Sequence, residues 1–426
     1  MKHLYRYFVL IALIFLLMTA ALHFVPKLVM KKDGYGGKLR CPLMPSELGE
    51  ISNKAEDSDK KWPACSFIHK HVREGSSKLP YVWDNDNGDD RIVSQMEFTP
   101  KIKGEKKVIW TRASDFNVPA GDAKFSTCPV NHCTIIEDES FPVIDAKLWN
   151  MQFSHMDMPR LNPARTKHPN QVWIIYNLES PLATPDYYLL DNLFNWTASY
   201  RRDSTIVTPY ERWRPHEKVK PSKKNRNYAA GKSRKAAMFI SNCDTSNGRM
   251  DYVHELQKYI DVHVYGACGD GTHNCDRFEN QTACIETLKR HYKFYLSFEN
   301  CNCRHYITEK FFVNALSTDV IPVVMGAHPD DYRAVAPPGS FIHVEDYNSP
   351  EDLAKYLHKL DKNDDLYNEY FKWKGTGSFI DTKFWCRLCA LLNDPDKPSV
   401  VVKSLSTWWR PPGVCIRRDQ TWKDLR

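Results

Sequence analysis

The segment FENCNCRHYITEKFF, residues 298–312, places polar and charged side chains between two apolar runs. The run before it, residues 293–298 (KFYLSF), and the run after it, residues 320–325 (VIPVVM), predict two buried strands. Between them apolar residues recur at helical spacing, and Thr308 is the expected N-cap of that helix. The segment therefore predicts a strand, a polar loop, a helix and a second strand.

This unit predicts a ligand site at one edge of a parallel sheet. Open parallel sheets bind ligands beyond the carboxyl ends of their strands, where the N–H groups of a following helix attract anions. Lys310 is then the expected partner of a diphosphate, and Glu309 the expected acceptor for sugar hydroxyls. Spacing alone describes a charged surface loop before an ordinary helix at least as well, so both interpretations stay open.

Further strands and helices surround this unit. Residues 236–241 (AAMFIS) and 262–265 (VHVY) predict strands, and the apolar positions between them predict a helix, which is the alternation of a Rossmann-like domain. An earlier α/β region has predicted strands at residues 108–111 and 172–176, and residues 351–360 and 367–373 predict late helices. The absence of a Walker A or GxGxxG motif disfavours an NTPase or a dinucleotide-binding protein.

Composition and charge set the broader class. The chain has 426 residues, of which 42% are hydrophobic, and this predicts two globular domains. Its net charge of +7 suits an anionic small-molecule substrate as well as a nucleic acid. The basic, proline-containing residues 212–235 indicate a solvated interdomain linker rather than a nucleic-acid arm.

The N-terminus predicts a membrane anchor. Residues 8–25 carry no charge and are about long enough to span a bilayer as a helix. A cleavable signal peptide is the alternative, because residues 19–21 (TAA) resemble a cleavage site, although the apolar stretch continues past them. Lysines and arginines on both sides leave the orientation open, and a cytosolic bulk domain is one outcome. The polar residues 26–80 indicate a stem.

Thirteen cysteines indicate an oxidising lumen rather than the cytosol, and their odd number leaves at least one unpaired. Cys386 and Cys389 form a CxxC that no second CxxC completes, so disulfides are favoured over zinc. We expect both to be oxidised, with each other or with cysteines of residues 41–133. Asn195 and Asn280 begin glycan acceptor sequons, which fits a lumenal domain.

A metal site needs separate treatment. Residues 84–86 (DND) form a carboxylate pair of the kind that can hold manganese between a nucleotide and a protein. They lie far in sequence from residues 298–312, and a polar turn explains them better. We therefore expect no metal ligand set and no obligatory cofactor, although divalent cations could stimulate activity.

Several longer segments carry a family resemblance. The runs at residues 292–316 (YKFYLSFENCNCRHYITEKFFVNAL), 241–260 (SNCDTSNGRMDYVHELQKYI) and 320–327 (VIPVVMGA) closely resemble the α1,3-fucosyltransferases that use GDP-fucose. The resemblance covers about residues 80–426 and includes NLESP (177–181), FNWTASYRRDS (194–204) and FIHVEDYNSPEDLAKYL (341–357). FKWKGTG (371–377) and WWRPPGVC (408–415) are more similar to invertebrate core-type enzymes, which modify the innermost GlcNAc of N-glycans, than to Lewis-type enzymes.

This resemblance implies a GT-B fold, with two Rossmann-like α/β domains facing a cleft, in a single-pass type II protein of the Golgi membrane. The implied division is a cytoplasmic tail at residues 1–7, the anchor at 8–25, the stem at 26–80, an acceptor-side domain at 81–225, a GDP-fucose domain at 226–385 and a tail at 386–426 that packs back through its CxxC. The implied partners are GDP-fucose, an N-glycan acceptor on glycoproteins and the Golgi membrane, with no nucleic acid.

The resemblance also implies the reaction and its residues. L-fucose would move with inversion from GDP-β-L-fucose to O3 of a GlcNAc in N-glycans, with the core GlcNAc favoured over outer LacNAc or LacdiNAc GlcNAc. Glu179 matches the family's catalytic base, and the donor-binding positions are matched by Arg249, Tyr306, Glu309 and Lys310 and, more loosely, by Ser241, Asn242 and Asn300. FENCNC departs from the family's FENS form, so the pairing of Cys301 and Cys303 stays open. A lumenal lectin without turnover and a transferase for another sugar donor are the competing classes.

Overall fold

A computed structural model describes residues 90–102, 104–151, 168–218, 226–271, 281–398 and 400–425. All of them belong to the second of the two units into which the chain divides, Cys65–Arg426. The expected anchor, the stem, residues 84–86 and Asn280 lie outside the described residues. Among the helices that are described, none is both long and apolar enough to cross a membrane.

The first sheet contains six parallel strands in the order β2-β1-β3-β4-β5-β6. They are β1 (Lys107–Trp110), β2 (Cys133–Ile136), β3 (Ala146–Asn150), β4 (Val172–Asn177), β5 (Trp196–Ser199) and β6 (Ile206–Val207). Every residue of β3 and β5 is buried, which is typical of parallel strands covered on both faces. The strands predicted near residues 108–111 and 172–176 are confirmed.

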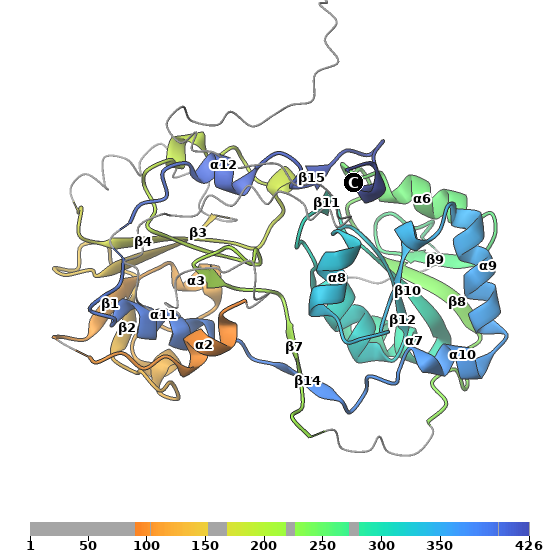
Figure 1. The fold of residues 1–426 in the computed structure, drawn as a ribbon, viewed down its shortest axis with the longest axis horizontal. Helices are drawn as coiled ribbons and strands as arrows, with labels where there is room; N and C mark the ends of the chain where they lie inside the picture. The colour runs from red at the N-terminus through yellow and green to blue at the C-terminus, as the bar shows by residue number, and fades with distance from the viewer. Residues whose placement is uncertain are drawn as a thin grey trace, which may run out of the picture. The chain divides into compact units, whose positions relative to one another are not determined.

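The second sheet contains five parallel strands in the order β13-β12-β10-β8-β9. They are β8 (Arg234–Phe239), β9 (Val262–Tyr265), β10 (Tyr292–Phe298), β12 (Ile321–Met325) and β13 (Ile342–His343). Helices α6 (Arg249–Leu256) and α9 (Pro350–Asp361) share one apolar core cluster with this sheet. In Figure 1, α9 lies to the right of the strands of this sheet and α6 lies above them. The predicted parallel α/β architecture is confirmed.

Shorter elements complete the chain. The other α-helices of the described residues are α2 (Ile92–Glu97), α3 (Ala113–Phe116), α7 (Gln281–His291), α8 (Pro329–Val335), α10 (Asp364–Glu369), α11 (Phe384–Leu392) and α12 (Leu405–Trp409). Two antiparallel ribbons join distant segments: β7 (Arg212–Pro215) pairs with β14 (Gly377–Ile380), and β11 (Asn302–Cys303) pairs with β15 (Cys415–Ile416).

The helix expected to begin after Thr308 is not a regular α-helix. Lys310–Ala315 forms a π-helix and Leu316–Thr318 a 3-10 turn. The Thr308 hydroxyl donates to Glu299 at 3.0 Å, and the bond it accepts from the Lys310 main-chain N–H is long, at 3.4 Å, so Thr308 is a poor cap. The polar loop competes with the helix for the capping hydroxyl.

The basic residues 212–235 are not simply a solvated linker. Arg212 pairs with Asp90 at 2.6 Å, and β7 is held in its ribbon with β14. The Lys232 ammonium donates to the main-chain oxygen of Asp319, and burial lowers the pKa of Lys232 to about 7. Charge counting in sequence could not identify which lysine would be enclosed.

The C-terminal segment returns to the first sheet. Helix α11 packs on the core cluster of β1, β3 and β5. Its two cysteines form the disulfides Cys128–Cys386 and Cys133–Cys389. Of the two arrangements expected for this CxxC, the structure has the one with cysteines of residues 41–133. These bridges cross 258 and 256 residues of sequence and fix the tail to the first sheet.

The structure argues against Asn195 as a glycan acceptor. Its side chain is buried, its Oδ1 accepts from the Trp173 N–H at 2.8 Å, and its Nδ2 donates to the Val400 oxygen at 3.0 Å. The amide therefore links β4 to the returning tail, and its oxygen and nitrogen are both already hydrogen-bonded, which disfavours a bulky glycan there. A sequon is a three-residue signal that takes no account of burial.

Candidate active site

The carboxyl end of β4 presents Glu179. Asn177 ends the strand, and its Oδ1 accepts from the Glu179 N–H at 2.9 Å in a tight Asx-type turn. Ser180 then caps the 3-10 turn Pro181–Ala183 by accepting from the Ala183 N–H at 3.2 Å. The run NLESP thus turns the chain sharply at the sheet edge, and Glu179 is left half-buried there.

The carboxyl end of β10 holds a different carboxylate. Glu299 is fully buried, and its two oxygens accept from the Thr308 N–H at 2.8 Å and the Thr308 hydroxyl at 3.0 Å. Gly326 packs on it so closely that a Cβ at that glycine would lie 2.8 Å from the Glu299 Cβ. Burial raises the pKa of Glu299, and the Lys310 ammonium, 3.3 Å away, opposes that shift.

Lys310 is enclosed by acceptors. Its ammonium lies 3.0 Å from the Thr308 hydroxyl, 3.2 Å from Glu309 Oε1 and 3.3 Å from Glu299 Oε2, so each of its three protons has a partner. The two carboxylates raise the pKa of Lys310 despite burial, and Lys310 in turn lowers that of Glu309 against the opposing effect of burial. Of the two carboxylates beside Lys310, Glu309 is the accessible one, with a side chain that is 38% exposed.

Arg249 begins α6 and points inward. It is buried, and its guanidinium donates to the Phe298 and Asn242 main-chain oxygens, both at 2.8 Å. A solvent-facing helix residue, the alternative at this position, is therefore excluded. The Arg249 Nε and the Asn300 Oδ1 are buried without a hydrogen-bond partner among the described residues, whereas Ser241 and Asn242 are exposed. The loop after β8 and the loop after β10 are tied together through this arginine.

Tyr306 connects the ends of β4 and β10. Its hydroxyl donates to Glu179 Oε2 at 3.4 Å, and burial raises the pKa of Tyr306 far above its ordinary value, so the hydroxyl stays protonated. Tyr210 donates to the Leu178 oxygen at 3.0 Å beside the same turn. Cys301 is a buried free thiol, and burial raises its pKa to about 12. The structure thus brings Glu179, Tyr306, Glu309, Lys310 and Arg249 into one neighbourhood.

Sequence reasoning missed some of these groups. It gave Glu299 no role of its own, although this residue organises the loop. The signal that could have marked Glu299 was its position directly after a buried strand. Nothing in the sequence marked Tyr210, or the disulfide that joins Cys303 to Cys415 across 112 residues. In the described part of the chain no group of three His, Cys, Asp or Glu side chains could hold a metal ion, and residues 84–86 lie outside it.

Comparison with known proteins places this chain in a family. Residues 229–408 match the model "Glycosyltransferase family 10 (fucosyltransferase) C-term", and residues 104–211 match "Fucosyltransferase, N-terminal". The chain is 42% identical to Glycoprotein 3-alpha-L-fucosyltransferase A of Drosophila melanogaster, over 85% of this chain and 73% of that protein. The chain belongs to glycosyltransferase family 10. It is an α1,3-fucosyltransferase, and the predicted resemblance is confirmed.

Other family members are less similar. 4-Galactosyl-N-acetylglucosaminide 3-alpha-L-fucosyltransferase 9 is 36% identical in Cricetulus griseus and 35% in Homo sapiens, in both cases over 65% of this chain and 73% of that protein. A crystal structure of an α1,3-fucosyltransferase with GDP-fucose aligns with a TM-score of 0.47 at 16% identity, covering 72% of this chain and 97% of that one.

Proposed function

We propose that this fucosyltransferase transfers L-fucose from GDP-β-L-fucose to O3 of the Asn-linked core GlcNAc of N-glycans, with inversion at the fucose carbon. The observation that carries the chemistry is the 3.4 Å contact between Glu179 and Tyr306. It places a half-buried carboxylate from one sheet against the loop of the other sheet that carries Glu309 and Lys310.

Glu179 is the proposed general base. As O3 of the acceptor attacks C1 of fucose, the carboxylate takes the proton from that hydroxyl, and the C1–O bond breaks with its electron pair leaving on the diphosphate of GDP. The Asx turn of Asn177 and the Tyr306 hydroxyl orient the carboxylate for this transfer. Attack from the face opposite the leaving group converts the β-linked donor into an α-linked product.

Arg249 and Lys310 are the proposed cations for the leaving diphosphate. Each is pre-positioned, Arg249 by two main-chain oxygens and Lys310 by Thr308 and Glu299, so little reorganisation accompanies the growth of charge on the phosphate. When Lys310 turns to a phosphate oxygen, Glu309 is released to accept hydrogen bonds from sugar hydroxyls. Tyr306 and Asn300 complete the donor side, with Ser241 and Asn242 at its exposed margin.

The core GlcNAc is the proposed acceptor because of the similarity pattern. Identity is 42% over 85% of the chain with the Drosophila glycoprotein 3-alpha-L-fucosyltransferase A, against 35–36% over 65% with the galactosyl-N-acetylglucosaminide enzymes. The additional matched length and the core-type tail, residues 371–377 and 408–415, both favour the core acceptor.

A transfer assay tests this proposal. The full-length protein, solubilised in detergent, is incubated with GDP-fucose and a defined series of N-glycans that offer only a core GlcNAc, only an outer LacNAc or only an outer LacdiNAc. We expect an α1,3-linked fucose on the core GlcNAc, identified by NMR. Transfer only to outer GlcNAc would replace the acceptor assignment. Binding of GDP-fucose without transfer to any glycan would indicate a lectin-like protein, and a parallel screen of nucleotide sugars tests the donor.

We also propose that the enzyme acts in the Golgi lumen as a single-pass type II membrane protein and needs no obligatory metal. The uncharged residues 8–25 and the disulfides of the tail support this location. In sealed Golgi vesicles the region after residue 80 should resist added protease until detergent is added. Activity should survive EDTA, and full loss restored by Mn²⁺ would refute the metal assignment.

A further inference from the structure

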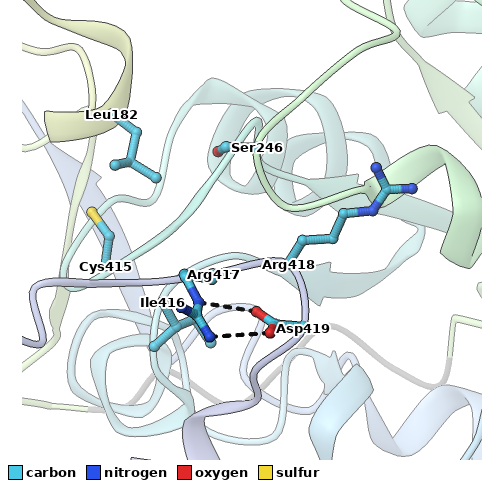
Figure 2. A pocket seen from close by; sticks show the side chains of 7 residues that line it. All are labelled: Leu182, Ser246, Cys415, Ile416, Arg417, Arg418 and Asp419. Atoms are coloured by element: carbon cyan, nitrogen blue, oxygen red, sulfur yellow. Dashed lines mark hydrogen bonds and ion pairs between the residues drawn. The ribbon is translucent and has the colours of Figure 1, made fainter. Parts of the chain in front are cut away.

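A groove of about 640 Å³ lies against the C-terminal segment of the chain (Figure 2), and its volume is within the range of roughly 300–1,000 Å³ typical of small-ligand sites. It is lined by Leu182, Ser246, Cys415, Ile416, Arg417, Arg418 and Asp419. Leu182 is three residues after Glu179, Ser246 is three residues before Arg249, and Cys415 is bonded to Cys303, three residues before Tyr306. Two of the segments that line the groove therefore also carry candidate site residues, and a disulfide joins Cys415 in its lining to the segment that carries Tyr306.

The C-terminal wall of this groove is firmly held. Strand β15 pairs with β11, the Cys303–Cys415 disulfide joins the same two strands, and the Arg304 N–H donates to the Val414 oxygen at 2.7 Å. Beyond the groove, the Trp422 indole is buried and donates to the Gly326 oxygen at 3.0 Å. The backbone of this segment is therefore held on both sides, which lowers the cost of ordering it when a ligand binds.

The charges of the wall are largely compensated within the protein. Arg417 makes two hydrogen bonds of 3.1 Å to Asp419, and Figure 2 shows this pair side by side with Arg418 pointing away from it. Arg418 pairs instead with Asp251 on α6. A paired Arg417 and Asp419 offer both donors and acceptors, which suits the hydroxyl groups of an uncharged glycan.

Leu182 adds an apolar face to the same groove. Its side chain is 48% exposed on the 3-10 turn Pro181–Ala183, directly after the proposed base. The C–H face of a sugar ring can cover such a side chain while the hydroxyls at the ring edge reach polar groups. The turn thus connects the groove to the atom that would accept the proton of the acceptor hydroxyl.

We propose that Cys415–Asp419 is the acceptor-binding wall of this enzyme, with the Arg417–Asp419 pair and Leu182 binding the sugar units next to the reacting GlcNAc. This inference rests on the proposed fucosyl transfer to an N-glycan and deepens it. It assigns acceptor recognition to the C-terminal tail. In the sequence, the strands of the second sheet lie between this tail and Glu179. Donor recognition stays with Arg249, Glu309 and Lys310.

The test measures the two substrates separately in Arg417→Ala and Leu182→Ala. Arg290→Ala and Leu189→Ala serve as matched controls, because Arg290 is an exposed arginine paired with Glu286 and Leu189 is a leucine of similar exposure on the turn Tyr188–Leu190. For Arg417→Ala we expect the acceptor KM to rise about tenfold, as for the loss of a charge-assisted hydrogen bond, and for Leu182→Ala about threefold. The donor KM should stay unchanged in both, and the controls should match the wild type.

The acceptor in this test is whichever glycan the wild type uses best, so a wrong choice of core GlcNAc does not affect it. Unchanged acceptor KM in both groove variants would overturn the acceptor wall, and so would a rise confined to the donor KM, which would place GDP-fucose in the groove. A thermal melt of each variant separates these outcomes from unfolding. If Arg417→Ala fails to fold, Asp419→Asn, which keeps the arginine, gives the same readout.

Discussion

The carboxyl ends of β4 and β10 each carry a glutamate, and the two glutamates are held in opposite ways. Glu299 is fully buried, accepts two hydrogen bonds from Thr308 and lies 3.3 Å from the Lys310 ammonium. Glu179 is half-buried, and within the described residues its carboxylate accepts one long bond, from Tyr306. Both oxygens of the Glu299 carboxylate are engaged by Thr308 or Lys310, which holds the loop together, whereas the Glu179 carboxylate keeps free lone pairs that can take a proton. We therefore propose a structural role for Glu299 and the role of general base for Glu179.

The largest expected effect tests the chemical side of this comparison. Glu179→Gln should lower turnover by about 10²–10⁴-fold, because the amide keeps the shape of the turn and cannot accept the acceptor's proton. GDP-fucose binding, measured by calorimetry, should be preserved. Glu211→Gln, a half-buried glutamate outside the site, is the control. Near-normal turnover in Glu179→Gln would remove it as the base.

The structural side is tested by breaking the buried pair. Lys310→Met leaves Glu299 without its cation, and we expect a loss of about 3–5 kcal/mol in the free energy of unfolding, together with weaker GDP-fucose binding. The double variant Glu299→Gln/Lys310→Met should recover part of the stability and none of the donor affinity. Denaturant unfolding and calorimetry measure the two effects.

Lys293→Met is the matched control for that experiment. Lys293 lies at the opposite end of β10 and forms a buried pair with Asp361 at 3.1 Å. Its loss should also destabilise the fold while leaving the affinity for GDP-fucose intact. If the affinity for GDP-fucose fell equally in both lysine variants, the loss would come from reduced stability and not from a lost contact between Lys310 and phosphate.

The pH dependence of stability gives a further test of the buried polar groups in the second sheet. His343 at the end of β13 is buried, its Nδ1 accepts from the Glu345 N–H at 3.1 Å, and burial lowers the pKa of His343 to about 4. The unfolded chain binds this proton more readily, so stability is complete above about pH 6.5 and falls as the pH drops toward 4, by about 3 kcal/mol. His343→Gln should flatten this slope in thermal melts, and exposed His254→Gln should leave it unchanged. An identical slope in all three proteins would contradict the assignment.

The smallest expected effect concerns the contact between the two glutamate regions. Tyr306→Phe removes the 3.4 Å bond to Glu179, and because such a long bond is weak, kcat should fall by about tenfold or less. Tyr210→Phe, which loses a bond to the Leu178 main chain, is the comparison. A loss in Tyr306→Phe as large as in Glu179→Gln would mean that the tyrosine itself takes part in proton transfer.

Much of the second sheet and its polar edge could be predicted from sequence. The residues of β8, β9, β10 and β12 carry their apolar runs locally, and polar residues that follow such runs must lie at the carboxyl edge of a parallel sheet. Lys310 and Glu309 were found this way, as was the helix that begins near Arg249. These features depend on neighbours within a few residues, which the sequence displays directly.

Tertiary structure decided what each of those residues does. Contacts between distant segments decide three features of the site and its surroundings. They turn Arg249 toward the Phe298 oxygen rather than solvent, and they bury Glu299 beside Lys310. They also set the disulfide partners of Cys386 and Cys389. The same is true of Asn195, which a local motif marks as exposed and the returning tail encloses. The sequence by itself determined the parallel α/β architecture and the polar edge, because periodicity is local. Burial and pairing, which enclose Glu299 and leave Glu179 half-buried, arise only when the segments pack together.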